Sequence, residues 1–220
     1  MRRLPDALCG IPRTGYKGLM RVPTGGPITP AETKNVKMKV CLVGEEGVGK
    51  SSLVRRFVVS QFDEKYLRTV GTMVSKKIVS LGPIDGANYT IHLLVWDIMG
   101  RRDFMSLYKE AYFSRARGVL AVCDLTRPET LDALHDWMDG IHASVGQVPM
   151  IVLANKKDMK DHLRVDEDDI LALCETYAAP YLFTSARTGE SVETAFAKLA
   201  EMAVRSRFAT PEPSPPEPAT

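Results

Sequence analysis

Residues 44–52 constrain the possible fold of this chain more strongly than any other stretch of the sequence. They read Gly44-Glu45-Glu46-Gly47-Val48-Gly49-Lys50-Ser51-Ser52 and fit the pattern G-x-x-x-x-G-K-[ST]. The apolar run over 36–43 predicts a buried strand before the motif, and the apolar spacing within 53–58 predicts a helix after it. A phosphate-binding loop belongs at such a strand-to-helix junction.

The residue types of this motif suit a nucleoside triphosphate. Glycines let backbone amides approach phosphate oxygens, and the positive end of the following helix adds to the attraction. We expect Lys50 to reach the β- and γ-phosphates and the Ser51 hydroxyl to bind Mg²⁺. An ordinary glycine turn is the alternative, and it would have to match both flanks by chance. The predicted phosphate contacts are Glu45, Glu46, Gly47, Val48, Gly49, Lys50, Ser51 and Ser52.

Composition places one folded domain between two extensions. With 220 residues and 45% apolar content the chain has room for a sizeable core, and its net charge of +2 argues against nucleic-acid binding. We expect residues 1–35 to be a disordered arm, because this Gly/Pro-rich stretch shows no periodicity. The arm is basic, with six Lys/Arg against two acidic residues within 1–36. Residues 36–208 form the predicted domain, and residues 209–220 a disordered Pro-rich tail.

Strands and helices alternate along the predicted domain. Most of the expected strands are continuous apolar runs, which is typical of a parallel sheet covered by helices on both faces. Residues 73–81 and 89–98 are instead joined by the turn Asp85-Gly86 and predict an antiparallel hairpin at one edge. Further strands are expected over 118–124, 149–154 and 181–184, and helices over 105–115, 129–145, 166–177 and 191–208.

Two residues at the carboxyl end of the strand over 89–98 extend the phosphate site. Asp97 ends this strand, 47 residues after Lys50. Ligands of parallel sheets bind at the carboxyl ends of the strands, so Asp97 is expected near Ser51, where it would hold Mg²⁺. The amide of Gly100 is expected to reach the γ-phosphate. Read alone, a strand-ending Asp is only a common cap.

Two later strand ends predict a guanine site. Asn155-Lys156-Lys157-Asp158 closes the strand over 149–154, and Ser185-Ala186-Arg187 follows the next strand. A carboxylate accepts two hydrogen bonds from guanine and has no matching pair on adenine, so Asp158 is expected to select the base. The amide of Ala186 is expected to meet the guanine O6. An N-K-x-D pattern alone is weak evidence, but its order after the other motifs strengthens it.

Taken together, these motifs make residues 36–208 resemble a small GTPase of the Ras superfamily, nearest to the Rab branch. The resemblance implies a G domain with six strands, five of them parallel, and a monomeric GTP/GDP switch that uses Mg²⁺. It also implies protein effectors and regulators that bind two switch regions, here residues 66–71 and 97–112. Thr69 matches the family threonine that binds Mg²⁺ when GTP is bound, and Phe62 matches the aromatic residue that packs on the guanine edge. By the same resemblance, Lys50 and Thr69 occupy catalytic positions.

Three departures from the family pattern bear on activity and attachment. Where the family has W-D-T-A-G-Q-E, this chain has Trp96-Asp97-Ile98-Met99-Gly100-Arg101-Arg102, so Arg101 replaces the glutamine that orients water. Glu46 stands where relatives have a small residue. No cysteine follows Cys174, so a prenylation signal is absent and a mainly cytoplasmic protein is expected. Membrane contact would then be weak and would come from the arm.

Arg101 leaves two functional alternatives open. The first is a switch with slow GTP hydrolysis, in which an ion pair with Glu46 holds Arg101 away from the γ-phosphate. The second is a scaffold that stays loaded with GTP and does no meaningful catalysis. A phosphotransferase acting on a small molecule is a third class, which Asn155 and Asp158 argue against.

Overall fold

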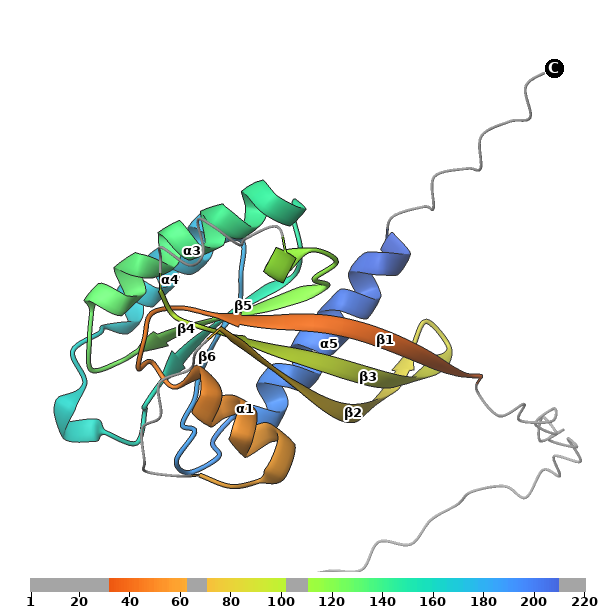
Figure 1. Ribbon diagram of the computed structural model, residues 1–220, viewed down its shortest axis with the longest axis horizontal. Helices are drawn as coiled ribbons and strands as arrows, with labels where there is room; N and C mark the ends of the chain where they lie inside the picture. The colour runs from red at the N-terminus through yellow and green to blue at the C-terminus, as the bar shows by residue number, and fades with distance from the viewer. Residues whose placement is uncertain (1–31, 63–70, 102–110, 210–220) are drawn as a thin grey trace, which may run out of the picture. The chain divides into compact units, whose positions relative to one another are not determined.

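The computed structural model describes residues 32–62, 71–101 and 111–209, the side chains of 207–209 excepted, as a six-stranded sheet with helices on both faces (Figure 1). The strand order is β2-β3-β1-β4-β5-β6, which confirms the predicted α/β class. The elements are β1 (Thr33–Val43), α1 (Lys50–Val59), β2 (Thr72–Ile84), β3 (Ala87–Ile98), β4 (Gly118–Asp124), α3 (Glu129–Val145), β5 (Met150–Asn155), a short 3-10 helix (Lys160–His162), α4 (Glu167–Tyr177), β6 (Tyr181–Phe183) and α5 (Val192–Ala209).

The first strand begins earlier than the sequence predicted. β1 starts at Thr33, so Thr33 to Asn35, which the sequence places in the arm, pair with Asn88 to Thr90 of β3. These three residues are polar and only partly covered, so no apolar pattern marked them as strand. Backbone pairing with β3 extends the sheet here without a buried side-chain face.

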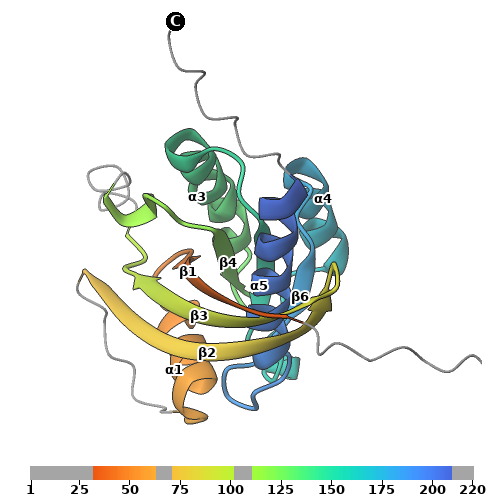
Figure 2. The ribbon, with the colours of Figure 1, turned by 90° about the vertical axis from the view of Figure 1, so that its right-hand side faces the viewer.

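The sheet is parallel except for its outer hairpin. β1 pairs in parallel with β3 and β4, β4 with β5, and β5 with β6, while β2 runs antiparallel to β3. Figure 2 shows β2 and β3 lying side by side, with β2 outermost. The register places Asp97 beside Leu42 and Asp124 beside Asn155, so four segments end at one edge of the sheet.

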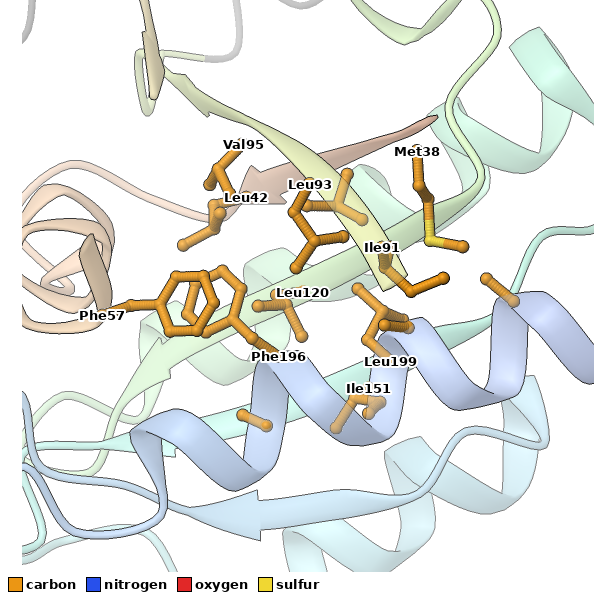
Figure 3. Packing of buried hydrophobic residues seen from close by; sticks show 14 of the residues in the cluster. Met38, Leu42, Phe57, Ile91, Leu93, Val95, Leu120, Ile151, Phe196 and Leu199 are labelled. Atoms are coloured by element: carbon orange, nitrogen blue, oxygen red, sulfur yellow. The ribbon is translucent and has the colours of Figure 1, made fainter. Parts of the chain in front are cut away.

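Helices cover both faces and bury two apolar clusters. α1 and α5 pack on one face, where Leu42, Leu93 and Leu120 of three strands meet the two helices (Figure 3). The rings of Phe57 in α1 and Phe196 in α5 stack there, with centroids 3.8 Å apart and planes 4° from parallel. α3 and α4 cover the opposite face, around the fully buried Trp137. Parallel strands buried on both faces explain their continuous apolar runs.

The remaining helix predictions agree closely, with one exception. The predicted helix over 105–115 falls largely outside the described residues, although 111–113 are helical. The last helix extends one residue beyond the predicted domain end at 208. No helix in the described part of the chain is long and apolar enough to span a membrane.

The Phe57–Phe196 stack supplies a test of the core. Phe57→Ala removes a fully buried ring between α1 and α5. We expect the free energy of unfolding to fall by about 3–5 kcal/mol, measured by urea denaturation. Val59→Ala in the same helix serves as the control, because Val59 is 53% exposed and should change stability by less than about 0.5 kcal/mol. Equal effects of the two substitutions would contradict this account of the core.

Candidate functional site

The loop between β1 and α1 closes around the side chain of Lys50. This residue begins α1, yet its ammonium group turns back and donates hydrogen bonds to the carbonyl oxygens of Gly44, at 2.7 Å, and Glu45, at 2.8 Å. Lys50 is only 6% exposed. Burial lowers its pKa to about 8, although the carboxylates of Asp97, Glu45 and Glu46 oppose that shift. The loop therefore holds the buried ammonium group of Lys50 at its centre, and the predicted contact of Lys50 with phosphate stays a prediction.

Two glycines allow neighbouring segments to touch this loop. Gly49 has a φ of +104°, and a Cβ there would lie 2.3 Å from the Asn155 amide nitrogen. A Cβ on Gly100 would lie 2.5 Å from the carbonyl carbon of Glu45 and 2.6 Å from the nitrogen of Glu46. Such distances exclude any side chain, so the segment after β3 rests directly against the phosphate loop.

Ser51 and Asp97 meet as expected for a shared cation site. The Ser51 hydroxyl donates a hydrogen bond to Oδ2 of Asp97, which is 1% exposed. Burial raises the pKa of Asp97, while Ser51 and Lys50 oppose the change. Its other oxygen, Oδ1, is buried and has no hydrogen-bond partner within the described part of the chain. An unpartnered carboxylate oxygen beside a hydroxyl fits a hard cation such as Mg²⁺.

The described residues offer few further ligands for such an ion. Among residues 32–62, 71–101 and 111–209, no group of three or more His, Cys, Asp or Glu side chains could hold a metal. This suits Mg²⁺, which usually takes one or two protein ligands and completes its shell with water and phosphate. Thr69, the other predicted ligand, lies outside the described residues.

The side chain of Asn155, at the end of β5, forms hydrogen bonds with the phosphate loop and with the segment after β6. Its amide nitrogen donates to the carbonyl of Val48 at 2.8 Å. Its oxygen accepts from the Thr184 hydroxyl at 3.2 Å and from the amide of Ala186 at 3.3 Å. Asn155 and the Ala186 amide, both predicted to face guanine, therefore bind each other in this structure. Their contact with a base stays a prediction.

The predicted base selector, Asp158, is held in place by the next loop. Its Oδ1 accepts a hydrogen bond from the Ser185 hydroxyl at 2.7 Å, and that hydroxyl in turn accepts from the amide of Thr188 at 3.1 Å. Asp158 is half-buried at the carboxyl edge of the sheet. The loop after β6 thus fixes the direction of this carboxylate, and its contact with a base stays a prediction.

The remaining predicted residues include Phe62, which follows α1, is half-buried and packs against the core beneath α1 and α5. Glu46 is half-buried and Arg101 is exposed, and their predicted ion pair stays a prediction. Apart from Phe62, the described candidates lie on four adjoining segments: the phosphate loop with the start of α1, the end of β3, the end of β5 and the loop after β6.

Sequence reasoning missed a buried carboxylate beside the site. Asp124 ends β4 and is fully buried. One oxygen accepts from the amide and hydroxyl of Thr126, at 3.0 and 2.7 Å. The other accepts from Arg127 at 2.9 Å and from Lys156 at 2.6 Å. Burial tends to raise the pKa of Asp124, but these bonds together lower it. Its place at a strand end, like that of Asp97, was the available signal.

Two further side chains that the sequence did not single out position the loops. Arg56 of α1 donates to the carbonyl of Ala186 at 2.9 Å and to that of Arg187, so it fastens the loop after β6. The indole nitrogen of the buried Trp137 donates to the carboxylate of Glu45 at 3.2 Å. Neither contact follows a local spacing rule.

Comparison with known proteins gives one consistent result. The sequence model described as the Ras family matches residues 39–205. The chain is 32% identical to Ras-related protein Rab-27B of Bos taurus over 176 residues, which are 76% of this chain and 80% of that protein. It is 33% identical to Ras-related protein Rab-7b of Mus musculus, in a match that covers 78% of this chain and 84% of that protein. It is 34% identical to Ras-related protein Rab-26 of Mus musculus, in a match that covers 92% of this chain and 79% of that protein.

Gly100 offers a test of the site's geometry. Gly100→Ala forces a Cβ against the backbone of Glu45 and Glu46, so we expect the free energy of unfolding to fall by about 1–3 kcal/mol in urea denaturation. Gly82→Ala is the matched control, because no described atom lies within 4 Å of a Cβ built there. A Gly100→Ala protein as stable as the control would show that the two segments do not touch.

Proposed function

Because the chain belongs to the Ras family and is a Rab-like small GTPase, we propose that it is a GTP-binding switch with slow hydrolysis of GTP to GDP and phosphate. The hydrogen bond between Ser51 and Asp97 carries this proposal, since it joins the phosphate loop to the end of β3 beside the buried Lys50. Switch loops that change order with nucleotide state would recruit protein effectors and regulators.

The phosphate end of the site would act by placing positive charge. Lys50, already held on the loop carbonyls, would meet the β- and γ-phosphates, and the loop amides would donate hydrogen bonds to phosphate oxygens. Ser51 and Asp97, with Thr69, would hold Mg²⁺, which neutralises charge that develops on the phosphates. Phosphoryl transfer depends mainly on such positioning and electrostatics.

The base end would select guanine through Asp158. Ser185 occupies one oxygen of this carboxylate and fixes its direction. Guanine offers two donors to a carboxylate, whereas adenine leaves the group unpaired at a substantial cost. Phe62, Lys156 and the Ser185-Ala186-Arg187 segment would complete the base site.

Base choice is directly testable. We expect the purified protein to bind GDP at least ~10³-fold more tightly than ADP, by isothermal titration or nucleotide exchange. Asp158→Asn should shift preference toward xanthosine diphosphate, whose C2 carbonyl suits an amide donor. Asp161→Asn, an exposed change in the following helix, should leave preference unaltered. Equal affinity for GDP and ADP would reject the proposal.

Arg101 is the reason for proposing slow hydrolysis. A guanidinium has no acceptor, so it cannot take a hydrogen bond from the attacking water as a glutamine does. If it contacted the γ-phosphate equally before and during transfer, it would only tighten GTP binding. Glu46 is half-buried in the phosphate loop, and an Arg101–Glu46 ion pair would occupy the guanidinium and hold it from the reacting group. A GTP-loaded scaffold with negligible hydrolysis is the second candidate, favoured by the same replacement.

Single-turnover phosphate release measures this effect. Small GTPases with the glutamine hydrolyse GTP unaided on the order of 10⁻⁴ s⁻¹, and we expect a lower rate here. Arg101→Gln should raise the rate, and adding Glu46→Gly should raise it beyond the two single effects combined. Arg117→Gln, an exposed arginine at the amino end of β4, is the control.

Fast hydrolysis would contradict this expectation. If the unaltered protein hydrolysed GTP at 10⁻⁴ s⁻¹ or faster, on the order of the rate given above, and Arg101→Ala lowered that rate, Arg101 would stabilise the transition state as an arginine finger in cis. No release above the spontaneous rate in any variant would favour the scaffold. We further propose a monomer in the cytoplasm, with at most weak contact between the basic arm and anionic membranes.

A further inference from the structure

The buried carboxylate of Asp124 lies between the two ends of the nucleotide site. Lys156, which belongs to the base-side sequence Asn155-Lys156-Lys157-Asp158, binds its Oδ2 at 2.6 Å. Arg127 binds the same oxygen through Nε at 2.9 Å. Asp124 is fully buried, so both cations are fixed on one group that has no access to water.

The same guanidinium also reaches the phosphate loop. Nη2 of Arg127 donates to the carbonyl oxygen of Glu46 at 3.0 Å, across 81 residues of sequence. A Cβ on Gly47 would lie 3.5 Å from Nη2, so the guanidinium lies along the loop backbone. One planar group thus bonds a carboxylate and a carbonyl at once, which suits the fixed fork of arginine.

The backbone around Arg127 is held as firmly as its side chain. The amide of Arg127 donates to the carbonyl of Asp124 at 2.9 Å, and the Thr130 hydroxyl donates to the carbonyl of Arg127 at 2.7 Å. Thr126 occupies the other carboxylate oxygen of Asp124. This turn, between β4 and α3, is therefore a rigid support from which Arg127 reaches the phosphate loop.

We infer that Arg127 is a positioning residue that couples the phosphate loop to the base-side loop through Asp124, and so slows the release of bound guanine nucleotide. The nucleotide can leave only when both the phosphate loop and the base-side loop move away from it. Because both loops are bonded to Asp124, directly or through Arg127, movement of one loop disturbs the other. The indole of Trp137 adds a second hold on the phosphate loop, through the carboxylate of Glu45. This inference rests on the proposed function, because it concerns the residence time of the same ligand.

The first experiment measures dissociation of fluorescent GDP from the full-length protein, chased with excess unlabelled GDP. We expect Arg127→Ala to release GDP at least tenfold faster, which corresponds to about 1.4 kcal/mol. Arg127→Lys should restore only part of the difference, because an ammonium cannot bind the carboxylate and the Glu46 carbonyl through one rigid fork. Arg205→Ala, which removes an exposed ion pair with Glu201 in α5, should release GDP at the unaltered rate.

The second experiment tests the link through Asp124 with a double-mutant cycle. Asp124→Asn removes the charge that both cations share, so it should also speed release. Adding Arg127→Ala to Asp124→Asn should then speed release by less than twofold, well below its effect in the unaltered background. A Trp137→Phe variant, which keeps an aromatic side chain but removes the indole N–H that binds Glu45, should release GDP faster by a smaller factor and remains informative if Asp124→Asn does not fold.

Three outcomes would overturn the inference. They are an unchanged rate in Arg127→Ala, full restoration by Arg127→Lys, and independent effects of Arg127→Ala and Asp124→Asn. The first would show that the contact does not hold the nucleotide, and the second that charge alone is enough. If the unaltered protein did not bind guanine nucleotides, the proposed function itself would fail. Binding with an Arg127→Ala rate equal to that of the unaltered protein would defeat only this inference.

Discussion

The parallel pairing of β1 with β3 and β4 is the constraint on which the site depends. Parallel strands point the same way, so their carboxyl ends meet at one edge. That pairing brings the loop after β1 against the segment after β3, closely enough that Gly100 has no room for a Cβ. The two apolar clusters, one beneath α1 and α5 and the other beneath α3 and α4, hold the strands in this arrangement.

Two buried carboxylates at this edge of the sheet, Asp124 and Asp97, differ in their hydrogen bonding. Asp124 is fully buried and receives four hydrogen bonds, so its negative charge is compensated within the protein. Asp97 is equally buried, yet its Oδ1 has no partner among the described residues. The hydrogen bonds to Asp124 tie it to the neighbouring loops, whereas the unpartnered Oδ1 of Asp97 fits the cation proposed for this site. The same contrast separates the supporting role of Arg127 from the ligand-facing role proposed for Lys50.

The acidic residues of the phosphate loop give the site its individual character. Glu45 and Glu46 add negative charge close to where a polyphosphate would bind. The carboxylate of Glu45 bonds the indole of Trp137, and the carbonyl of Glu46 bonds Arg127, so α3 and the turn before it hold this loop from one side.

The sequence alone determined the fold class, the hairpin and the grouping of Lys50, Ser51 and Asp97, because local spacing and apolar runs indicate where strands end. It predicted that β1 starts at Val36, three residues after the observed start at Thr33, because polar residues that pair only through the backbone leave no apolar pattern. Tertiary structure decided what Asp124, Arg127 and Arg56 do. Their contacts join segments 81 and 130 residues apart, and the reach of a side chain across folded segments has no signature in local spacing.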